Sequence, residues 1–335
     1  MRVVVSELCL EHNPPYEVLS GQLQAYYESP DRIERILTAL TTAPSQTEPD
    51  DEPNTAHYDI VRFDNWTAGD VVTDRQLATY VKQVHDADYL DYLRTVYGQW
   101  VNEGGNPTWV AALASARLCI EATRMLLEPE SDLPVAFALC RPPGHHATPG
   151  LCGGYCYINN VAVAAKFLVG SWSERKPKVA ILDIDAHHGN GTSKIFYDDP
   201  DTLYVSLHAS PDYPYYTGST AERGGPQALG LNQNYPLPLK TDNLLYISTL
   251  STAVGEIKRW KPDFLFVSLG VDTYCEDPIT DFEITLEAYP EMGSMIAQIN
   301  VKTCFVMEGG YSAEIGQCVK GVLDGYQKAS KKSRA

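Results

Sequence analysis

The densest group of chemically active side chains lies in the stretch 179–192, VAILDIDAHHGNGT. Its first half is apolar and its second half is polar and glycine-rich, which is typical of a buried parallel strand and the turn that leaves it. In a strand, Asp183, Asp185 and His187 would project to one face, because side chains alternate. Zinc accepts such N and O ligands at about 2.0–2.2 Å. A turn cap beside exposed histidines is the ordinary alternative.

Polar residues follow three further apolar runs of the chain. They are His145-His146 after the run 133–139, Asp272 after the run 264–270 and Tyr311 after the run 303–307. Each has an ordinary interpretation by itself, namely an exposed histidine pair, a helix cap and a tight turn. Because ligands bind at the carboxyl ends of strands in open α/β sheets, we expect all four groups to converge on one edge.

Together these residues supply the parts of metal-assisted amide hydrolysis. Asp185, His187 and Asp272 would leave open positions on a metal for water and substrate. Such a metal lowers the pKa of its water and polarises the carbonyl group. A histidine pair offers a base for the water and an acid for the leaving amine, and a tyrosine hydroxyl can hydrogen-bond the developing oxyanion.

The charge balance limits the partners. A net charge of −17 over 335 residues argues against nucleic acid, because phosphates would be repelled. The same field would attract a cationic substrate, although an acidic surface can also serve solubility alone. No run approaches the ~18–20 apolar residues of a membrane span, and the first ten residues do not resemble a signal peptide. We expect no membrane partner.

The cysteines point to a reducing compartment. The eight cysteines have no tight spacing, which indicates reduced thiols and a cytoplasmic protein rather than a disulfide scaffold. Cys152 and Cys156 lie near the histidine pair and form a second, weaker set of zinc ligands. The carboxylate and histidine set is better formed.

The pattern of apolar residues predicts alternating strands and helices. Strands are expected at 2–8, 133–139, 179–185, 203–207, 264–270 and 303–307, and helices at 31–40, 77–92, 109–127, 157–169, 242–260 and 286–300, with a final helix after them. Residues 13–27, 41–57 and 208–237 are expected as loops. This alternation predicts a single domain over residues 1–335, a three-layer α/β/α fold with a mostly parallel central sheet.

Six segments spread over nearly the whole chain form a recognisable set. They are 141–147 (RPPGHHA), 153–160 (GGYCYINN), 182–192 (LDIDAHHGNGT), 205–208 (VSLH), 268–273 (SLGVDT) and 307–311 (MEGGY), with Glu28-x-Pro30-x-Arg32 near the start. The chain thereby resembles the zinc-dependent histone deacetylase superfamily, and within it most closely the acetylpolyamine amidohydrolases. The resemblance implies an arginase/deacetylase-like fold.

The resemblance also implies a role for each matching residue. It implies zinc ligands at Asp185, His187 and Asp272, a general base and acid at His146, an electrostatic partner at His145, orienting groups at Asp183 and Asn190, and a carbonyl-polarising group at Tyr311. It places a structural potassium ion near Asp183, Asp185, His187, Ser206 and Leu207. Substrate would pass Gly154 and Tyr155, opposite Tyr215 or Tyr216, with Glu17 in the entrance loop and Arg32 beside an inner acetate channel.

Three departures from the family pattern bear on the substrate. Many histone deacetylases have Asp where Asn190 stands, which favours the polyamine branch. Bacterial polyamine amidohydrolases carry a long insertion that helps form a dimer, whereas this chain has only residues 95–110 there. A glutamate gatekeeper of some polyamine-specific deacetylases is replaced by Ile279. The oligomeric state and the substrate of this chain therefore stay open.

We predict a zinc-dependent amidohydrolase that removes acetyl or another short acyl group from an amine. The expected substrate is an acetylpolyamine or a related small, cationic acetylated amine. Acetyl-lysine in proteins and a secondary-metabolite amide are alternatives, as are iron and cobalt in place of zinc. A dinuclear ureohydrolase is disfavoured by the tandem histidines and Tyr311, and a catalytically silent binding module by the complete ligand set.

Overall fold

A parallel sheet forms the centre of the molecule. The computed structural model describes residues 1–19, 21–42, 57–64, 72–97, 106–128, 134–172 and 175–332. In these ranges eight strands lie in the order β4-β1-β5-β10-β9-β6-β7-β8, and every neighbouring pair is parallel. The strands are β1 (Arg2–Val5), β4 (Asp59–Arg62), β5 (Val135–Ala138), β6 (Val179–Asp183), β7 (Thr202–Ala209), β8 (Asn232–Leu237), β9 (Phe264–Leu269) and β10 (Lys302–Met307).

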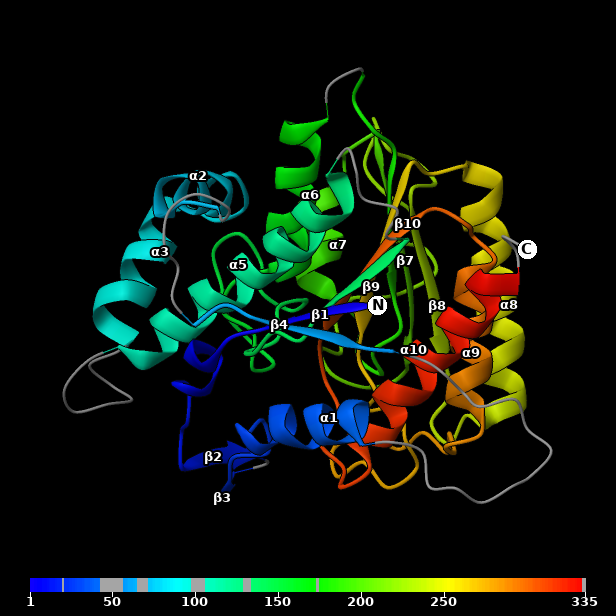
Figure 1. Cartoon of the computed structure of the whole chain (residues 1–335), viewed down its shortest axis with the longest axis horizontal. Helices are drawn as coiled ribbons and strands as arrows, with labels where there is room; N and C mark the ends of the chain where they lie inside the picture. Colours follow the sequence, from blue (N-terminus) through cyan, green and yellow to red (C-terminus); the bar gives the residue numbers. More distant parts are fainter. Residues whose placement is uncertain are drawn as a thin grey trace.

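Helices cover both faces of this sheet, so the predicted three-layer α/β/α fold is confirmed (Figure 1). They are α1 (Asp31–Thr41), α2 (Asp74–Val84), α3 (Ala87–Tyr92), α5 (Pro107–Leu127), α6 (Asn160–Ser171), α7 (Asn190–Phe196), α8 (Asn243–Trp260), α9 (Ala288–Ala297) and α10 (Ile315–Lys332), with short turns of helix at η1 (Glu7–Leu10) and η2 (Leu93–Tyr97). In one layer α5, α6 and α7 pack on the strands, and in the other α8 packs on β7 while α9 and α10 link it to α1.

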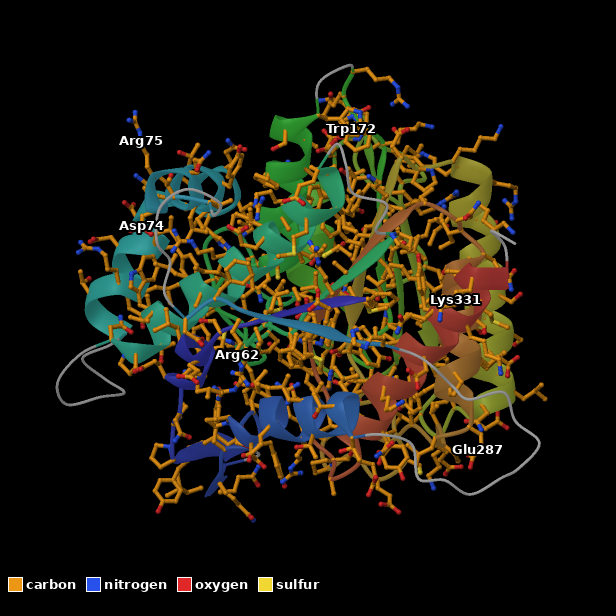
Figure 2. The ribbon with its side chains drawn as sticks, in the orientation of Figure 1. Arg62, Asp74, Arg75, Trp172, Glu287 and Lys331 are labelled. Carbon is orange, nitrogen blue, oxygen red and sulfur yellow. The ribbon has the colours of Figure 1, made fainter. Side chains whose placement is uncertain are left out.

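The central strands are apolar along their whole length because both of their faces are covered. Every residue of β5, β6, β7 and β9 is buried. Charged side chains such as those of Arg75, Glu287 and Lys331 point outward instead (Figure 2). None of the helices in the described ranges is long and apolar enough to cross a membrane. A single domain over residues 1–335 stays a prediction.

Several elements differ from the sequence-based expectation. The expected loop 13–27 contains a hairpin of β2 (Tyr16–Leu19) and β3 (Gln22–Ala25), turned at Gly21 with a φ of 78°. The strands β4 and β8 and the helix α7 were not predicted either. Both strands lie at the edges of the sheet, where polar residues are tolerated and an apolar run is absent. Most of the expected connection 41–57 and of the segment 95–110 lies outside the described residues.

The helix expected over residues 77–92 is interrupted at His85, which separates α2 from α3. The backbone there is extended, with φ −118° and ψ 145°. The His85 ring contacts the Thr148 carbonyl oxygen at 3.0 Å through Nδ1 and accepts the Asn159 N–H at 2.9 Å through Nε2. These contacts hold the segment that follows the predicted histidine pair.

Candidate active site

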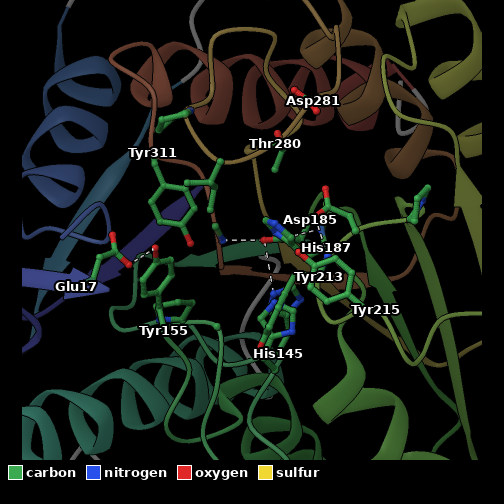
Figure 3. A pocket seen from close by; sticks show the side chains of 18 of the residues that line it. Glu17, His145, Tyr155, Asp185, His187, Tyr213, Tyr215, Thr280, Asp281 and Tyr311 are labelled. Atoms are coloured by element: carbon green, nitrogen blue, oxygen red, sulfur yellow. Dashed lines mark hydrogen bonds and ion pairs between the residues drawn. The ribbon is translucent and has the colours of Figure 1, made fainter. Parts of the chain in front are cut away.

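The four predicted groups converge on one cavity, because β5, β10, β9 and β6 are neighbours at the centre of the sheet. The segments that leave the carboxyl ends of these strands line a cavity of about 670 Å³. Figure 3 shows its side chains, and the residues lining it are Glu17, Val18, Pro143, His145, His146, Gly154, Tyr155, Asp185, His187, Pro211, Asp212, Tyr213, Tyr215, Leu239, Pro278, Ile279, Thr280, Asp281, Gly309 and Tyr311.

Asp185, His187 and Asp272, here called the ligand cluster, come together beside this cavity, which Asp185 and His187 line while Asp272 is buried next to them. The nearest ligand atoms of these three buried side chains all lie within 4.8 Å of one another. His187 Nδ1 is 3.1 Å from Asp185 Oδ1 and 3.0 Å from Asp272 Oδ2. The strand β6 ends at Asp183, so strand alternation does not align Asp185 with His187. Instead the His187 N–H donates to Asp185 Oδ1 at 2.9 Å within the turn.

Backbone donors hold the second oxygen of each carboxylate in the ligand cluster. The N–H of Gly309 donates to Asp185 Oδ2 at 2.9 Å, and the N–H of Ala186 donates to Asp272 Oδ1 at 2.8 Å. A Cβ at Gly309 would lie 2.4 Å from Asp272 Oδ2, and one at Gly270 would lie 2.1 Å from Asp185 Oδ2. Only glycine at these two positions lets the strand ends approach the carboxylates so closely.

The electrostatics of the ligand cluster fit a cation. Burial and the neighbouring Asp185 raise the pKa of Asp272 to about 6. Burial opposes a charge on His187, yet its hydrogen bonds to the two aspartates raise its pKa well above the usual value. Among the ion pairs of the described residues, no Lys or Arg reaches either carboxylate of the cluster. Two buried carboxylates that share one imidazole and have no Lys or Arg partner therefore favour a further positive charge between them.

The histidine pair carries two different charge states. His145 Nδ1 lies 3.1 Å from Asp183 Oδ2. Burial lowers the pKa of His145, but the negative charges of Asp185 and Asp183 outweigh burial and raise it to about 10. Burial and the nearby His145 and His187 lower the pKa of His146 well below its usual value. At neutral pH His145 is therefore charged and His146 neutral, as a base must be.

Asn190 fixes the tautomer of His146. Its Oδ1 lies 2.7 Å from His146 Nδ1 and can only accept a hydrogen bond, so Nδ1 carries the proton. The other ring nitrogen, Nε2, then keeps a free lone pair. A Cβ at Gly154 would lie 2.3 Å from the His146 ring, so this glycine admits the imidazole beside the cavity.

Tyr311 faces the ligand cluster from the opposite wall. Its hydroxyl points into the cavity in Figure 3. Its backbone N–H donates to Asp277 Oδ2 at 2.7 Å. Burial raises the pKa of the phenol well above its usual value although the Arg32 guanidinium works against this. The hydroxyl therefore keeps its proton and can donate a hydrogen bond.

Glu28, Arg32 and Arg141, here called the arginine cluster, lie behind Tyr311. Both guanidinium groups donate to Glu28 Oε1, Arg32 Nη1 at 2.6 Å and Arg141 Nε at 2.8 Å. Arg32 also donates to the carbonyl oxygens of Gly310 and Glu308, at 2.7 Å and 2.6 Å. Its guanidinium carbon lies 4.8 Å from the centre of the Tyr311 ring.

The predicted substrate residues are brought to the cavity with one exception. The Tyr155 hydroxyl donates to Glu17 Oε2 at 2.7 Å, and Glu17 Oε1 accepts the Tyr27 N–H at 3.0 Å. Tyr155 has a φ of 64°, which turns its ring toward Tyr311 at a centroid distance of 5.5 Å. Tyr215 lines the cavity, whereas Tyr216 is 93% exposed and does not.

Sequence reasoning missed three residues of this wall, Asp212, Tyr213 and Asp281. The Tyr213 ring packs edge-on against His146 at 4.9 Å between centroids. The segment 210–216, SPDYPYY, indicated a proline- and tyrosine-rich loop, but nothing in it indicates which tyrosine turns inward.

Ser206 and Leu207, two residues of the predicted potassium site, lie on β7, where Ser206 pairs with Asp183. The potassium site there stays a prediction.

The fold and the site define an α/β protein with a candidate metal-binding site at the carboxyl edge of a parallel sheet. The chain belongs to the histone deacetylase family, since residues 26–326 match the histone deacetylase domain. It is 33% identical to acetylpolyamine amidohydrolase 1 of Pseudomonas aeruginosa over 94% of this chain and 95% of that protein. It is 34% identical to acetylpolyamine amidohydrolase of Mycoplana ramosa over 97% and 99%.

A solved structure shares the whole architecture. The crystal structure of acetylpolyamine aminohydrolase from Burkholderia pseudomallei superposes with a TM-score of 0.84 at 28% sequence identity, covering 98% of this chain and 99% of that one. The predicted family and the predicted fold class are both confirmed by these likenesses.

Proposed function

We propose that this protein is a zinc-dependent deacetylase that removes an acetyl group from a small, cationic acetylated amine. The chain is a hydrolase of the histone deacetylase family that acts on amide bonds. The observation that carries the proposal is the meeting of the ligand cluster, the neutral His146 and the protonated Tyr311 around one cavity. The names of its relatives, acetylpolyamine amidohydrolases, support the same substrate class.

The ligand cluster would hold the zinc ion. When bound, zinc would polarise the acetyl carbonyl and lower the pKa of the attacking water. His146 takes the water proton at Nε2, since Nδ1 is committed to Asn190. The same nitrogen then protonates the departing amine. Tyr311 donates its hydroxyl proton in a hydrogen bond to the developing oxyanion.

Acidic residues at the mouth of the cavity favour a cationic substrate. Glu17, Asp212 and Asp281 approach the mouth from three separate segments of the chain. The described lining of the cavity contains no Lys or Arg. A second ammonium group on the substrate would therefore meet carboxylates and no Lys or Arg there, in a protein whose net charge is −17.

Turnover of a small panel of acetylated amines tests the proposal. The panel contains acetylputrescine, acetylspermidine, a neutral acetylated alkylamine and an acetyl-lysine peptide, with metal content determined on the same sample. We expect about one zinc ion per chain and the highest kcat/KM for the acetylated polyamines. A preference for the peptide would replace the substrate class, and zinc-loaded protein that hydrolyses none of them would refute the activity. Two transition ions per chain would instead favour a ureohydrolase.

A further inference from the structure

Glu308 is a buried acid that the mechanism above does not use. It follows the last residue of β10 and is 0% exposed. Among the described ion pairs it has no Lys or Arg partner, because Arg32 binds its backbone carbonyl and not its carboxylate. Carboxylates are seldom buried without an ionic partner, since desolvation disfavours the charge. Its hydrogen bonds therefore have to account for its position.

The Glu308 carboxylate holds the backbone that carries the histidine pair. Its Oε2 accepts the N–H of Gly144 at 2.7 Å and the N–H of His145 at 3.1 Å. Its Oε1 accepts the Ser268 hydroxyl at 3.3 Å, from the end of β9. Glu308 lies 164 positions from Gly144 and 163 positions from His145 in the sequence, so this contact joins two distant segments of the chain.

The other hydrogen-bond partners of the histidine pair contact its rings or a backbone carbonyl oxygen, not the N–H groups that Glu308 accepts. Asp183 and Asn190 each contact one ring nitrogen. The Thr192 N–H donates to the His145 carbonyl oxygen at 3.1 Å, whereas Glu308 accepts the N–H groups of Gly144 and His145. Next to Glu308, the Gly309 N–H holds Asp185 of the ligand cluster. The turn that follows β10 thus contacts both the ligand cluster and the histidine pair.

We propose that Glu308 is a positioning residue, whose carboxylate hydrogen-bonds the Gly144 and His145 backbone and thereby fixes His146 relative to the ligand cluster. The kinetic part of this inference rests on the proposed deacetylase activity. Burial raises the pKa of Glu308 to about 7, so the site already tolerates a neutral side chain of this shape. A glutamine can accept both N–H groups through its oxygen, and its NH2 group can donate to the Ser268 hydroxyl that Oε1 accepts from in the wild type.

The test compares Glu308→Ala with Glu308→Gln. In Glu308→Ala we expect kcat to fall about 100-fold, because a displacement of an ångström can cost this much, while KM changes less than about threefold and zinc content is unchanged. In Glu308→Gln we expect at least about one third of the wild-type kcat, because the hydrogen bonds from the Gly144 and His145 backbone remain. Hydrogen exchange of a peptide spanning residues 141–148 should be faster in the alanine variant only.

A matched control is Glu121→Ala. Glu121 is also 0% exposed and accepts a backbone N–H, that of Val72 at 2.5 Å, but it lies on α5 and does not line the cavity. It should lower the melting temperature without lowering kcat of the folded fraction.

Two results would overturn the proposal. They are a kcat within about threefold of wild type in zinc-loaded Glu308→Ala, or an equal loss in Glu308→Gln, which would assign the effect to the charge. If Glu308→Ala does not fold, Glu308→Asp replaces it, with an expected tenfold or larger loss of kcat because the carboxylate is withdrawn by one methylene. If the wild type hydrolyses no acetylated amine, the proposed function fails, while hydrogen exchange in Glu308→Gln and Glu308→Asp still decides whether the carboxylate holds this backbone.

Discussion

Two buried charged clusters lie on either side of Tyr311, and they have opposite imbalances. In the ligand cluster two carboxylates share one imidazole. In the arginine cluster two guanidinium groups share one carboxylate oxygen of Glu28. Buried charges need partners of opposite sign. The net charge of each cluster therefore indicates the sign of the ion that it could bind.

The difference teaches how to separate a structural ion pair from a binding site. In the arginine cluster the guanidinium groups also donate to backbone carbonyl oxygens, so most of their donors are used within the fold. In the ligand cluster the two carboxylates share His187 and each accepts a backbone N–H, but among the described ion pairs neither has a Lys or Arg partner. The negative surplus of the ligand cluster therefore fits a bound cation, whereas the arginine cluster braces the wall behind Tyr311.

Breaking the ligand cluster should have the largest effect. In Asp272→Asn one of the two carboxylates loses its charge. We expect zinc content and kcat/KM to fall by more than about 100-fold, because even residues that only orient metal ligands commonly cost 10–100-fold. Metal analysis and turnover on the same sample check this. Asp263→Asn, at the exposed ion pair with Arg175, should change neither, and full zinc occupancy in Asp272→Asn would contradict the assignment.

Removing the hydroxyl between the two clusters should separate chemistry from metal binding. In Tyr311→Phe we expect zinc content to stay as in the wild type while kcat falls about 10²–10³-fold, as when an oxyanion donor is lost. Steady-state kinetics with acetylspermidine measures this. Unchanged turnover would show that the Tyr311 hydroxyl does not stabilise the oxyanion.

Breaking the arginine cluster should act mainly on stability. Arg32→Met leaves two buried carbonyl oxygens and Glu28 with one donor fewer, so we expect the free energy of unfolding to fall by about 3 kcal/mol. Because the family resemblance places Arg32 beside an inner acetate channel, inhibition by acetate should also weaken. Urea unfolding and acetate titration measure the two effects.

Arg35→Met is the control on the same helix. Its exposed pair with Asp31 should contribute less than about 1 kcal/mol to the free energy of unfolding. If both arginine variants lost the same free energy of unfolding, the buried cluster would stabilise the fold no more than the exposed ion pair does.

Neutralising the mouth should have the smallest effect. Glu17→Gln keeps an acceptor for the Tyr155 hydroxyl but removes a charge. We expect KM for acetylspermidine to rise about threefold, as for a partly exposed ion pair, with no change for a neutral acetylated alkylamine. An equal change in KM for both substrates would show that Glu17 affects the shape of the cavity and not the binding of a positive charge.

Sequence reasoning predicted which residues lie together, because they follow strongly apolar strands whose ends must share one edge. It failed where long-range contacts decide. The break at His85 depends on partners at Thr148 and Asn159, and β8 carries polar residues because it lies at the edge of the sheet. Glu308 looked like part of a glycine-rich turn, since its partner Gly144 is 164 positions away. The inward turn of Tyr213 left no periodic signal either.

The order of the strands also affects how the protein is made. Of the strands in the described ranges, β10 is synthesised last, yet it lies between β5 and β9 at the centre of the sheet. Until its residues emerge, a nascent chain has two separate half-sheets and no Tyr311. Assembly of the reaction centre therefore depends on the insertion of this one strand between the two groups of strands.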